Sequence, residues 1–212
     1  MKIAGMMKLG VILALFAAAA CVMLAFVYTG TAAIIEQRQQ ADLHTVLRDI
    51  FPDAHSFEPI IGMDSPYAPV TIQSAYAAMI DGNVAGAALR VSRAGYSGPI
   101  VSMVGINSQG IITGVRILEH TETPGLGANA ISASYFVNRA NGITFFGQFT
   151  GKSTGDPFEV NNDVIIITAS TITSHAVASS VRAAGMAATA WLSGLENITE
   201  DAASGATEGG LH

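Results

Sequence analysis

Cysteine is almost absent from this 212-residue sequence, and its scarcity excludes several classes of site. With Cys21 as the only cysteine, the chain cannot form an internal disulfide, a multi-cysteine zinc site, a haem attachment or an iron–sulfur cluster. The five histidines are scattered along the chain, so we expect no metal site. If the protein carries out redox chemistry, it needs an organic cofactor.

Basic residues are also scarce, and charge is missing altogether from residues 9–35. Only Lys2 and Lys8 precede this run, so the remainder holds eight basic against sixteen acidic residues, a formal charge of −8. An acidic domain without basic clusters argues against nucleic-acid binding.

The uncharged run of 27 residues is long enough for a membrane-spanning helix, which needs about 20 apolar residues. A cleaved signal peptide is one alternative, although its apolar region is usually only about 7–15 residues long. A lipoprotein signal at Cys21 is another, although Ala18 stands where a larger aliphatic residue is usual. We expect an uncleaved anchor over residues 1–35.

The charges that flank the run predict its orientation. Two lysines precede the run, and Glu36, Arg38 and Asp42 follow it. Short positive flanks stay in the cytoplasm. We therefore expect a single-pass protein of the inner (cytoplasmic) membrane, with a cytoplasmic N-terminus and its domain on the outer, periplasmic side.

Patterning after the anchor predicts an α+β fold, an antiparallel sheet packed against helices. Residues 36–69 are interpreted as a juxtamembrane helix over 37–51, ended by Pro52, and a loop over 53–69. Residues 70–192 form the main domain. Its expected strands are 70–80, 84–92, 100–106 and 111–118, with turns at 81–83 and 107–110 and a tight loop at 95–99.

The second half of the domain turns alanine-rich and predicts mainly helices. We expect a short helix over 128–138, an apolar patch at 145–149, a short buried strand over 164–168 and a long helix over 174–192. Residues 193–212 are rich in Gly, Ala, Ser and Glu and are expected to be a flexible tail.

Three stretches stand out as candidates for chemistry: GYSGPI at 95–100, HTETPGLG at 120–127 and TASTITSHAV at 168–177. In the second, Pro124 fixes the backbone, while Gly125 and Gly127 permit close approach to a flat ligand that Leu126 can cover. In the third, hydroxyls stand at the start of the long helix, where a phosphate is favoured. Taken singly, these stretches also fit an ordinary turn and a plain helix cap.

Together with FGQFTGK at 146–152, the three stretches resemble, in sequence order, the FMN-binding domains of the Rnf G subunit and of the C subunit of the sodium-pumping NADH:quinone reductase. The resemblance covers residues 37–192 and extends to the anchor, and the chain length favours the Rnf subunit. It implies FMN esterified to Thr171. The other cofactor-binding residues it suggests are Ser170, Ile172, Thr173, Ser174, Glu122, Thr123, Pro124, Gly125, Leu126, Gly127 and Lys152.

The resemblance is incomplete at the attachment stretch. Ala169 replaces a usual glycine, and Ile165 stands where the family usually has an aspartate, with Asp163 two residues early. The tail spells the attachment motif in full at 201–207, ending at Thr207, but with no helix expected after it. His120 and Glu122 are interpreted either as residues that tune the flavin or relay protons, or as solvated residues at a strand end.

The implied function is a flavoprotein electron carrier within an ion-translocating ferredoxin:NAD oxidoreductase, with a flavin transferase and other Rnf membrane subunits as partners. No catalytic residue and no independent enzymatic activity are expected of this chain alone. The alternatives are a C-type subunit of the quinone reductase, and a flavin-free scaffold or sensor domain on a membrane anchor.

Overall fold

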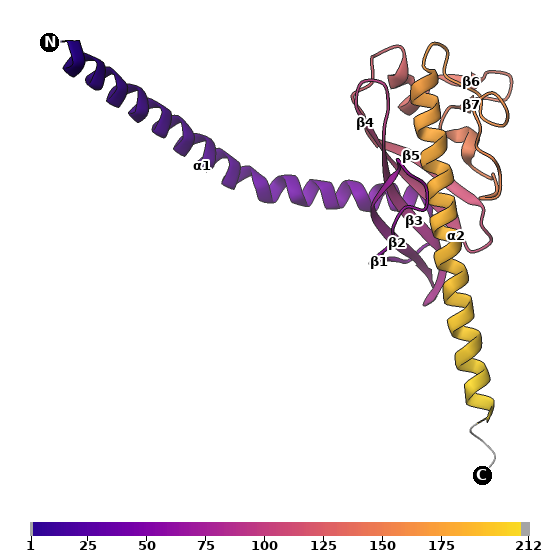
Figure 1. The fold of residues 1–212 in the computed structure, drawn as a ribbon. Coiled ribbons are helices and arrows are strands. Elements are labelled where there is room, and N and C mark those ends of the chain that lie inside the picture. The colour runs from indigo at the N-terminus through magenta and orange to yellow at the C-terminus, as the bar shows by residue number, and fades with distance from the viewer. Residues whose placement is uncertain (1, 209–212) are drawn as a thin grey trace. The chain divides into compact units, whose positions relative to one another are not determined.

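The structure, a computed structural model, describes the backbone of residues 2–208 and the side chains of residues 7, 8, 10–32 and 41–195 (Figure 1). The chain divides into two compact units, Met1–Thr45 and Val46–His212. The first is helical throughout its described residues, and the second contains the sheets and the candidate site.

The long N-terminal helix α1 spans Lys2–Ile50. It includes the segment Gly10–Ala32, of 23 residues and mean hydropathy 2.7, long and apolar enough to cross a membrane. The predicted juxtamembrane helix is confirmed and is continuous with the anchor helix. Its end at Ile50, two residues before Pro52, agrees with the restriction that proline places on the residue before it.

A five-stranded antiparallel sheet follows, in the order β1-β2-β3-β4-β5. Its strands are β1 (Ser56–Ile60), β2 (Thr71–Ile80), β3 (Asn83–Ala94), β4 (Pro99–Asn107) and β5 (Ile112–Glu119). The turn between β2 and β3 holds Asp81 and Gly82 at positive φ, 49° and 79°, as a two-residue hairpin of this twist requires. The four predicted strands are confirmed to within two residues at each end.

Three predictions about smaller elements are wrong. Residues 53–69 are not all loop, because β1 lies within them and adds a fifth strand. Residues 128–138 form not a helix but the 3₁₀ helix η1 (Gly127–Ile131) and the strand β6 (Phe136–Asn138), which pairs with β7 (Ile143–Thr144). Residues 164–168 are buried only in part and form no strand beyond a bridge between Val160 and Val164. The predicted apolar patch contains a second 3₁₀ helix, η2 (Gly147–Phe149).

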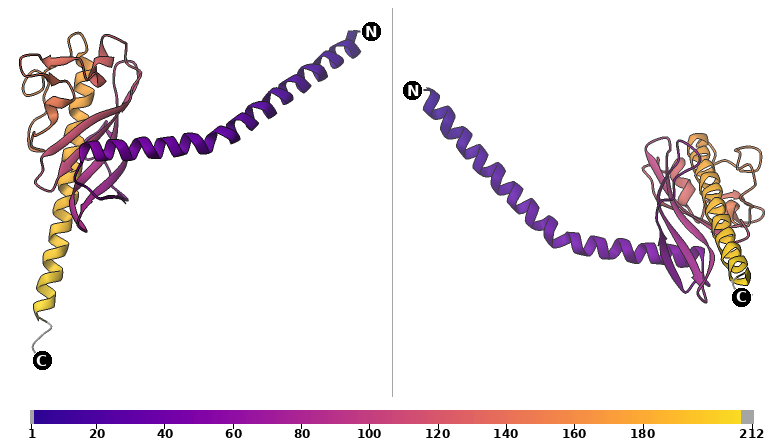
Figure 2. Two further views of the ribbon diagram at one scale, coloured as in Figure 1. Left: turned by 180° about the vertical axis from the view of Figure 1, so that it is seen from behind. Right: turned by 60° about the horizontal axis from the view of Figure 1, so that its bottom comes forward.

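The last helix, α2, spans Thr171–Glu208, longer than predicted at both ends, so the backbone of residues 193–208 is helical. It runs along one face of the sheet against β3 and β4 (Figure 2). Alternation along each strand turns Leu89, Val91, Val104 and Ile106 toward this helix, where they form the main core with side chains such as Val181.

The end of α1 packs on part of the opposite face of the sheet. Leu47, Ile50 and Phe51 are buried there. A Cβ at Gly105 would overlap both Ile50 and Phe51, so glycine at this strand position lets the helix end approach closely. Asp49 adds an ion pair, accepting a hydrogen bond of 2.5 Å from Nε of Arg116 on β5. Both faces of the sheet therefore contact a helix.

Candidate functional site

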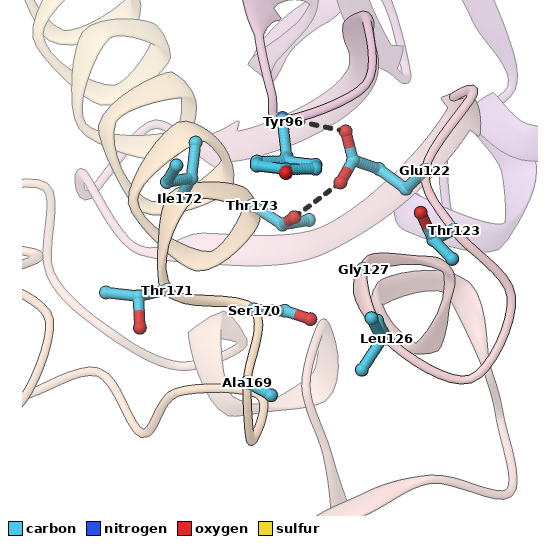
Figure 3. Close-up of a pocket in the computed structure, with 10 residues that line it drawn as sticks. All are labelled: Tyr96, Glu122, Thr123, Leu126, Gly127, Ala169, Ser170, Thr171, Ile172 and Thr173. Carbon is cyan, nitrogen blue, oxygen red and sulfur yellow. Dashed lines mark hydrogen bonds between the residues drawn. The ribbon is translucent and has the colours of Figure 1, made fainter.

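The three sequence stretches meet around one pocket of about 420 Å³ at the start of α2 (Figure 3). The stretch at 95–100 is the turn between β3 and β4, the stretch at 120–127 follows β5, and the stretch at 168–177 leads into α2. The pocket is lined by Tyr96, Glu122, Thr123, Leu126, Gly127, Ala169, Ser170, Thr171, Ile172 and Thr173.

Glu122 holds the three stretches together. Its side chain is buried, and Oε1 accepts hydrogen bonds of 2.9 Å from the backbone N–H groups of Tyr96 and Ser97. Oε2 accepts a hydrogen bond of 2.6 Å from the hydroxyl of Thr173 in the first turn of α2. Glu122 is therefore not a solvated residue at a strand end. Its carboxylate cross-links the walls of the pocket.

The two glycines of the second stretch serve different purposes. A Cβ at Gly127 would overlap Glu122 Oε2 and approach Thr173 Oγ1 within 2.6 Å, so this glycine makes room for the carboxylate. Gly125 instead has a φ of 78° with open space around it, so it is needed for the turn. Gly125 and Pro124, both predicted to contact the ligand, are not among the lining residues.

The hydroxyl groups at the start of α2 differ in availability. Thr173 is bonded to Glu122, while Ser174 is fully buried, donates to the carbonyl of Ser170 at 2.9 Å and accepts from the N–H of Ile167 at 3.0 Å. Ser170 Oγ is buried without a hydrogen-bond partner in the described part of the chain, and it points toward Gly127 in Figure 3. Buried hydroxyls are normally satisfied, so this unpaired hydroxyl is available to a group bound in the pocket.

Thr171 is the first residue of α2, and its side chain is exposed at the pocket. Its hydroxyl has no hydrogen-bond partner among the described residues. The N–H groups of Thr171, Ile172 and Thr173 also lack an acceptor within that part of the chain, as expected for a first helical turn. Free N–H groups and the helix dipole make this end of the pocket favourable for an anionic group.

Apolar side chains form the other walls of the pocket. Tyr96, Leu126 and Ile172 line it while staying 73%, 42% and 53% exposed, respectively. Large apolar groups at the edge of a cavity suit a flat, largely apolar ligand. The pocket therefore combines an apolar part with a polar end at the start of α2.

Lys152 lies outside this set, although it was predicted to bind the ligand. Its ammonium donates to Oδ2 of Asp163 at 2.9 Å and to the carbonyl of Asp163 at 2.7 Å. Burial alone would raise the pKa of Asp163, but the hydrogen bond and charge of Lys152, with the N–H of Glu159, hold this pKa below its ordinary value. The pair stabilises the loop before α2 and does not line the pocket.

Two lining residues were missed as site residues. Tyr96 belongs to the stretch at 95–100. The place of this stretch in the order of motifs could have identified Tyr96 as a site residue. Ala169 has a φ of 60°, in the left-handed region that alanine rarely adopts. The glycine that is usual at this position of the motif could have indicated a positive φ here, since glycine adopts this φ without strain.

Comparison with known proteins identifies the family of the chain. Residues 95–185 match the FMN-binding domain family, and residues 1–50 match the RnfG N-terminal region. The chain is 16% identical to NqrC of Shewanella oneidensis in its crystal structure, with a TM-score of 0.41, over 61% of this chain and 64% of that one.

Curated relatives are similar to this chain over most of their length. The G subunit of the Na⁺-translocating ferredoxin:NAD⁺ oxidoreductase complex of Acetobacterium woodii is 34% identical over 82% of this chain and 87% of its own. The G subunit of the ion-translocating oxidoreductase complex of Vibrio cholerae is 33% identical over 84% of this chain and 87% of its own. The chain therefore belongs to the RnfG family, the membrane-anchored G subunits of ion-translocating oxidoreductase complexes.

Proposed function

We propose that this protein is the flavoprotein subunit of an ion-translocating oxidoreductase complex and carries electrons between neighbouring membrane subunits. When bound, FMN supplies the redox chemistry, because its ring system can accept and release electrons singly. The proposal rests on the pocket that forms where the three motif stretches meet at the start of α2.

The residues of this pocket fit FMN. A volume of about 420 Å³ lies in the range of small-molecule sites. Ser170 Oγ and the free N–H groups of the first turn of α2 suit a phosphate, while Leu126 and Ile172 suit an apolar ring. Glu122 keeps the loops that carry these groups together.

We also propose that the phosphate is esterified to Thr171. Its hydroxyl is exposed and unpartnered among the described residues, and it stands beside the free N–H groups of the helix start. The competing residue, Thr207, is the penultimate residue of α2, where the backbone N–H groups are already used within the helix. The tail motif therefore offers no equivalent phosphate site.

The proposal also includes the individual partners of the protein and its orientation in the membrane. A flavin transferase attaches the FMN, and the other membrane subunits of the Rnf complex donate and accept the electrons. The N-terminus is cytoplasmic and the FMN domain lies on the outer side, because lysines precede the span and acidic residues follow it. A covalent bond suits that side, where lost FMN is not readily replaced.

The mass of the intact chain tests the attachment residue. The protein is purified from cells that also make the flavin transferase, and its mass should exceed that of the polypeptide by one FMN less one water. Thr171→Ala should abolish this gain, because the nucleophilic hydroxyl is removed. Thr171→Ser should retain part of it, since a hydroxyl remains.

Thr207→Ala is the matched control and should keep the full gain. A gain that persists in Thr171→Ala and disappears in Thr207→Ala would assign the flavin to the tail instead. A gain of two FMN units would show that both motifs are used. An unmodified wild-type chain without flavin fluorescence in denaturing gels would favour the flavin-free scaffold.

A further inference from the structure

A second pocket, of about 370 Å³, lies between α2, the end of β3 and the loop residues Phe158 to Val160. Its polar lining residues include Arg93, Arg182, His175 and Glu159, together with Tyr67. None of its lining residues lines the FMN pocket. The pocket brings together two arginines in a domain that is otherwise strongly acidic.

These two arginines differ from the other half-buried cations of the domain. Arg90 is paired with Glu119, Arg116 with Asp49, and Lys152 with Asp163. Arg93 and Arg182 are also half-buried, yet neither forms an ion pair or a hydrogen bond within the described part of the chain. The described protein therefore supplies no carboxylate to either guanidinium, and two like charges beside one pocket repel each other.

The fold positions both guanidinium groups at this pocket. Arg93 continues the alternation of Leu89 and Val91, so it is on the face of β3 that packs against α2. Arg182 lies on the same side of α2 as His175, at the seven-residue helical spacing. Its guanidinium lies 5.5 Å from the ring centroid of Tyr67, and this stacking restricts the arginine.

Glu159 is the one acidic group among the lining residues, and it does not neutralise the pair. Its side chain is exposed, and it lies within 4.0 Å of neither guanidinium. The two guanidinium groups outnumber this carboxylate, so the lining keeps a net positive charge. Planar guanidinium groups match the oxygens of phosphate, to which they donate paired hydrogen bonds.

We propose that this pocket binds a phosphate group through Arg93 and Arg182. The phosphate supplies the counter-charge that the protein does not, and Tyr67 holds one of the two guanidinium groups in place. A free phosphate ion and the headgroup of an anionic phospholipid share this chemistry. The site shares no lining residue with the proposed flavin site.

Thermal unfolding of the flavin-loaded, detergent-solubilised full chain tests the proposal. Inorganic phosphate should raise the unfolding temperature of the wild type more than chloride at the same ionic strength does. Arg93→Gln and Arg182→Gln should each weaken the apparent affinity for phosphate about tenfold, the loss of one charge-assisted interaction. Glu159→Gln should strengthen it, because a repulsive carboxylate is removed.

Arg139→Gln is the matched control, since Arg139 is an exposed arginine outside the pocket, and it should respond as the wild type does. A second arm replaces phosphate with short-chain phosphatidylglycerol, compared with short-chain phosphatidylcholine. A shift that depends on both arginines and occurs only with phosphatidylglycerol assigns the site to a lipid headgroup; one with phosphate assigns it to the free ion. Equal responses of wild type, Arg93→Gln and Arg182→Gln, or no response beyond that to chloride, overturn the proposal.

Discussion

Ala169 sits beside the proposed attachment residue in a conformation that costs an L-amino acid about 1–2 kcal/mol. Glycine adopts this φ freely but loses more entropy on folding, about 0.4–1 kcal/mol. Ala169→Gly should therefore stabilise the domain by about 0.5–1 kcal/mol, measured by chemical unfolding. Ala140→Gly, at an exposed alanine without positive φ, should destabilise it slightly. If both substitutions stabilised the domain, or both destabilised it, the positive φ of Ala169 would not explain the effect.

Asp163 predicts a dependence of stability on pH. Its pKa is lowered in the folded protein from an ordinary value of 3.8, so the stabilisation is fully present above that pH and is lost as the pH falls through the folded value. Asp163→Asn should lower the free energy of unfolding by about 1–2 kcal/mol at neutral pH. The difference in the free energy of unfolding between Asp163→Asn and the wild type should shrink below pH 3.8.

Asp64→Asn provides the comparison for this change. Asp64 is exposed, and none of the described residues forms an ion pair with it. This variant should unfold like the wild type at every pH. If Asp163→Asn differed from wild type by the same amount in acid as at neutral pH, the ion pair with Lys152 would not be the cause.

The sequence predicted most residues around the pocket but not the structural role of Glu122. The order of three motifs brought Glu122, Leu126 and Thr171 to one site, as the structure shows. The cross-linking role of Glu122 depends on where the turn at 95–98 lies in space, which no local pattern encodes. Lys152 lies apart from the pocket because its partner, Asp163, is in a loop whose path the pattern did not predict.

The contact between the end of α1 and the sheet predicts that two similar glycine substitutions affect stability unequally. A Cβ at Gly105 would overlap Ile50 and Phe51, so Gly105→Ala should destabilise the domain by about 1–3 kcal/mol. At Gly114 the nearest atom, Ile50 Cγ1, would be 3.6 Å from a Cβ, an ordinary contact. Gly114→Ala should be neutral or slightly stabilising. Equal thermal shifts would argue against close packing at Gly105.

Regular elements were predictable where the pattern was long. Strands β2 to β5 are each eight or more residues long and are separated by turns that contain glycine, and their predicted bounds hold to within two residues. The five-residue strand β1 was missed because Pro59 lies in it and the surrounding composition is typical of loops. The path of residues 160–170 depends on distant side chains, such as Gln148 bonded to both backbone groups of Ile165.

The family places the protein in a membrane, and the orientation stays a prediction. A reporter that is active only in the periplasm, fused after Ile35, should give a signal, because the lysines before the span stay in the cytoplasm. A reporter active only in the cytoplasm should be silent at the same junction. Activity of the second reporter there would reverse the proposed topology.

The packing of the sheet between the end of α1 and α2 sets the timing of folding during synthesis. Each strand can pair with its predecessor as it emerges, because the strands follow one another in sequence and in the sheet. The main core stays open to water until the ribosome has released α2, the last element of the domain. The proposed flavin pocket, whose polar end is the first turn of α2, is completed at the same moment. A truncation before Thr171 would therefore leave an aggregation-prone sheet with one bare apolar face rather than a weakened flavoprotein.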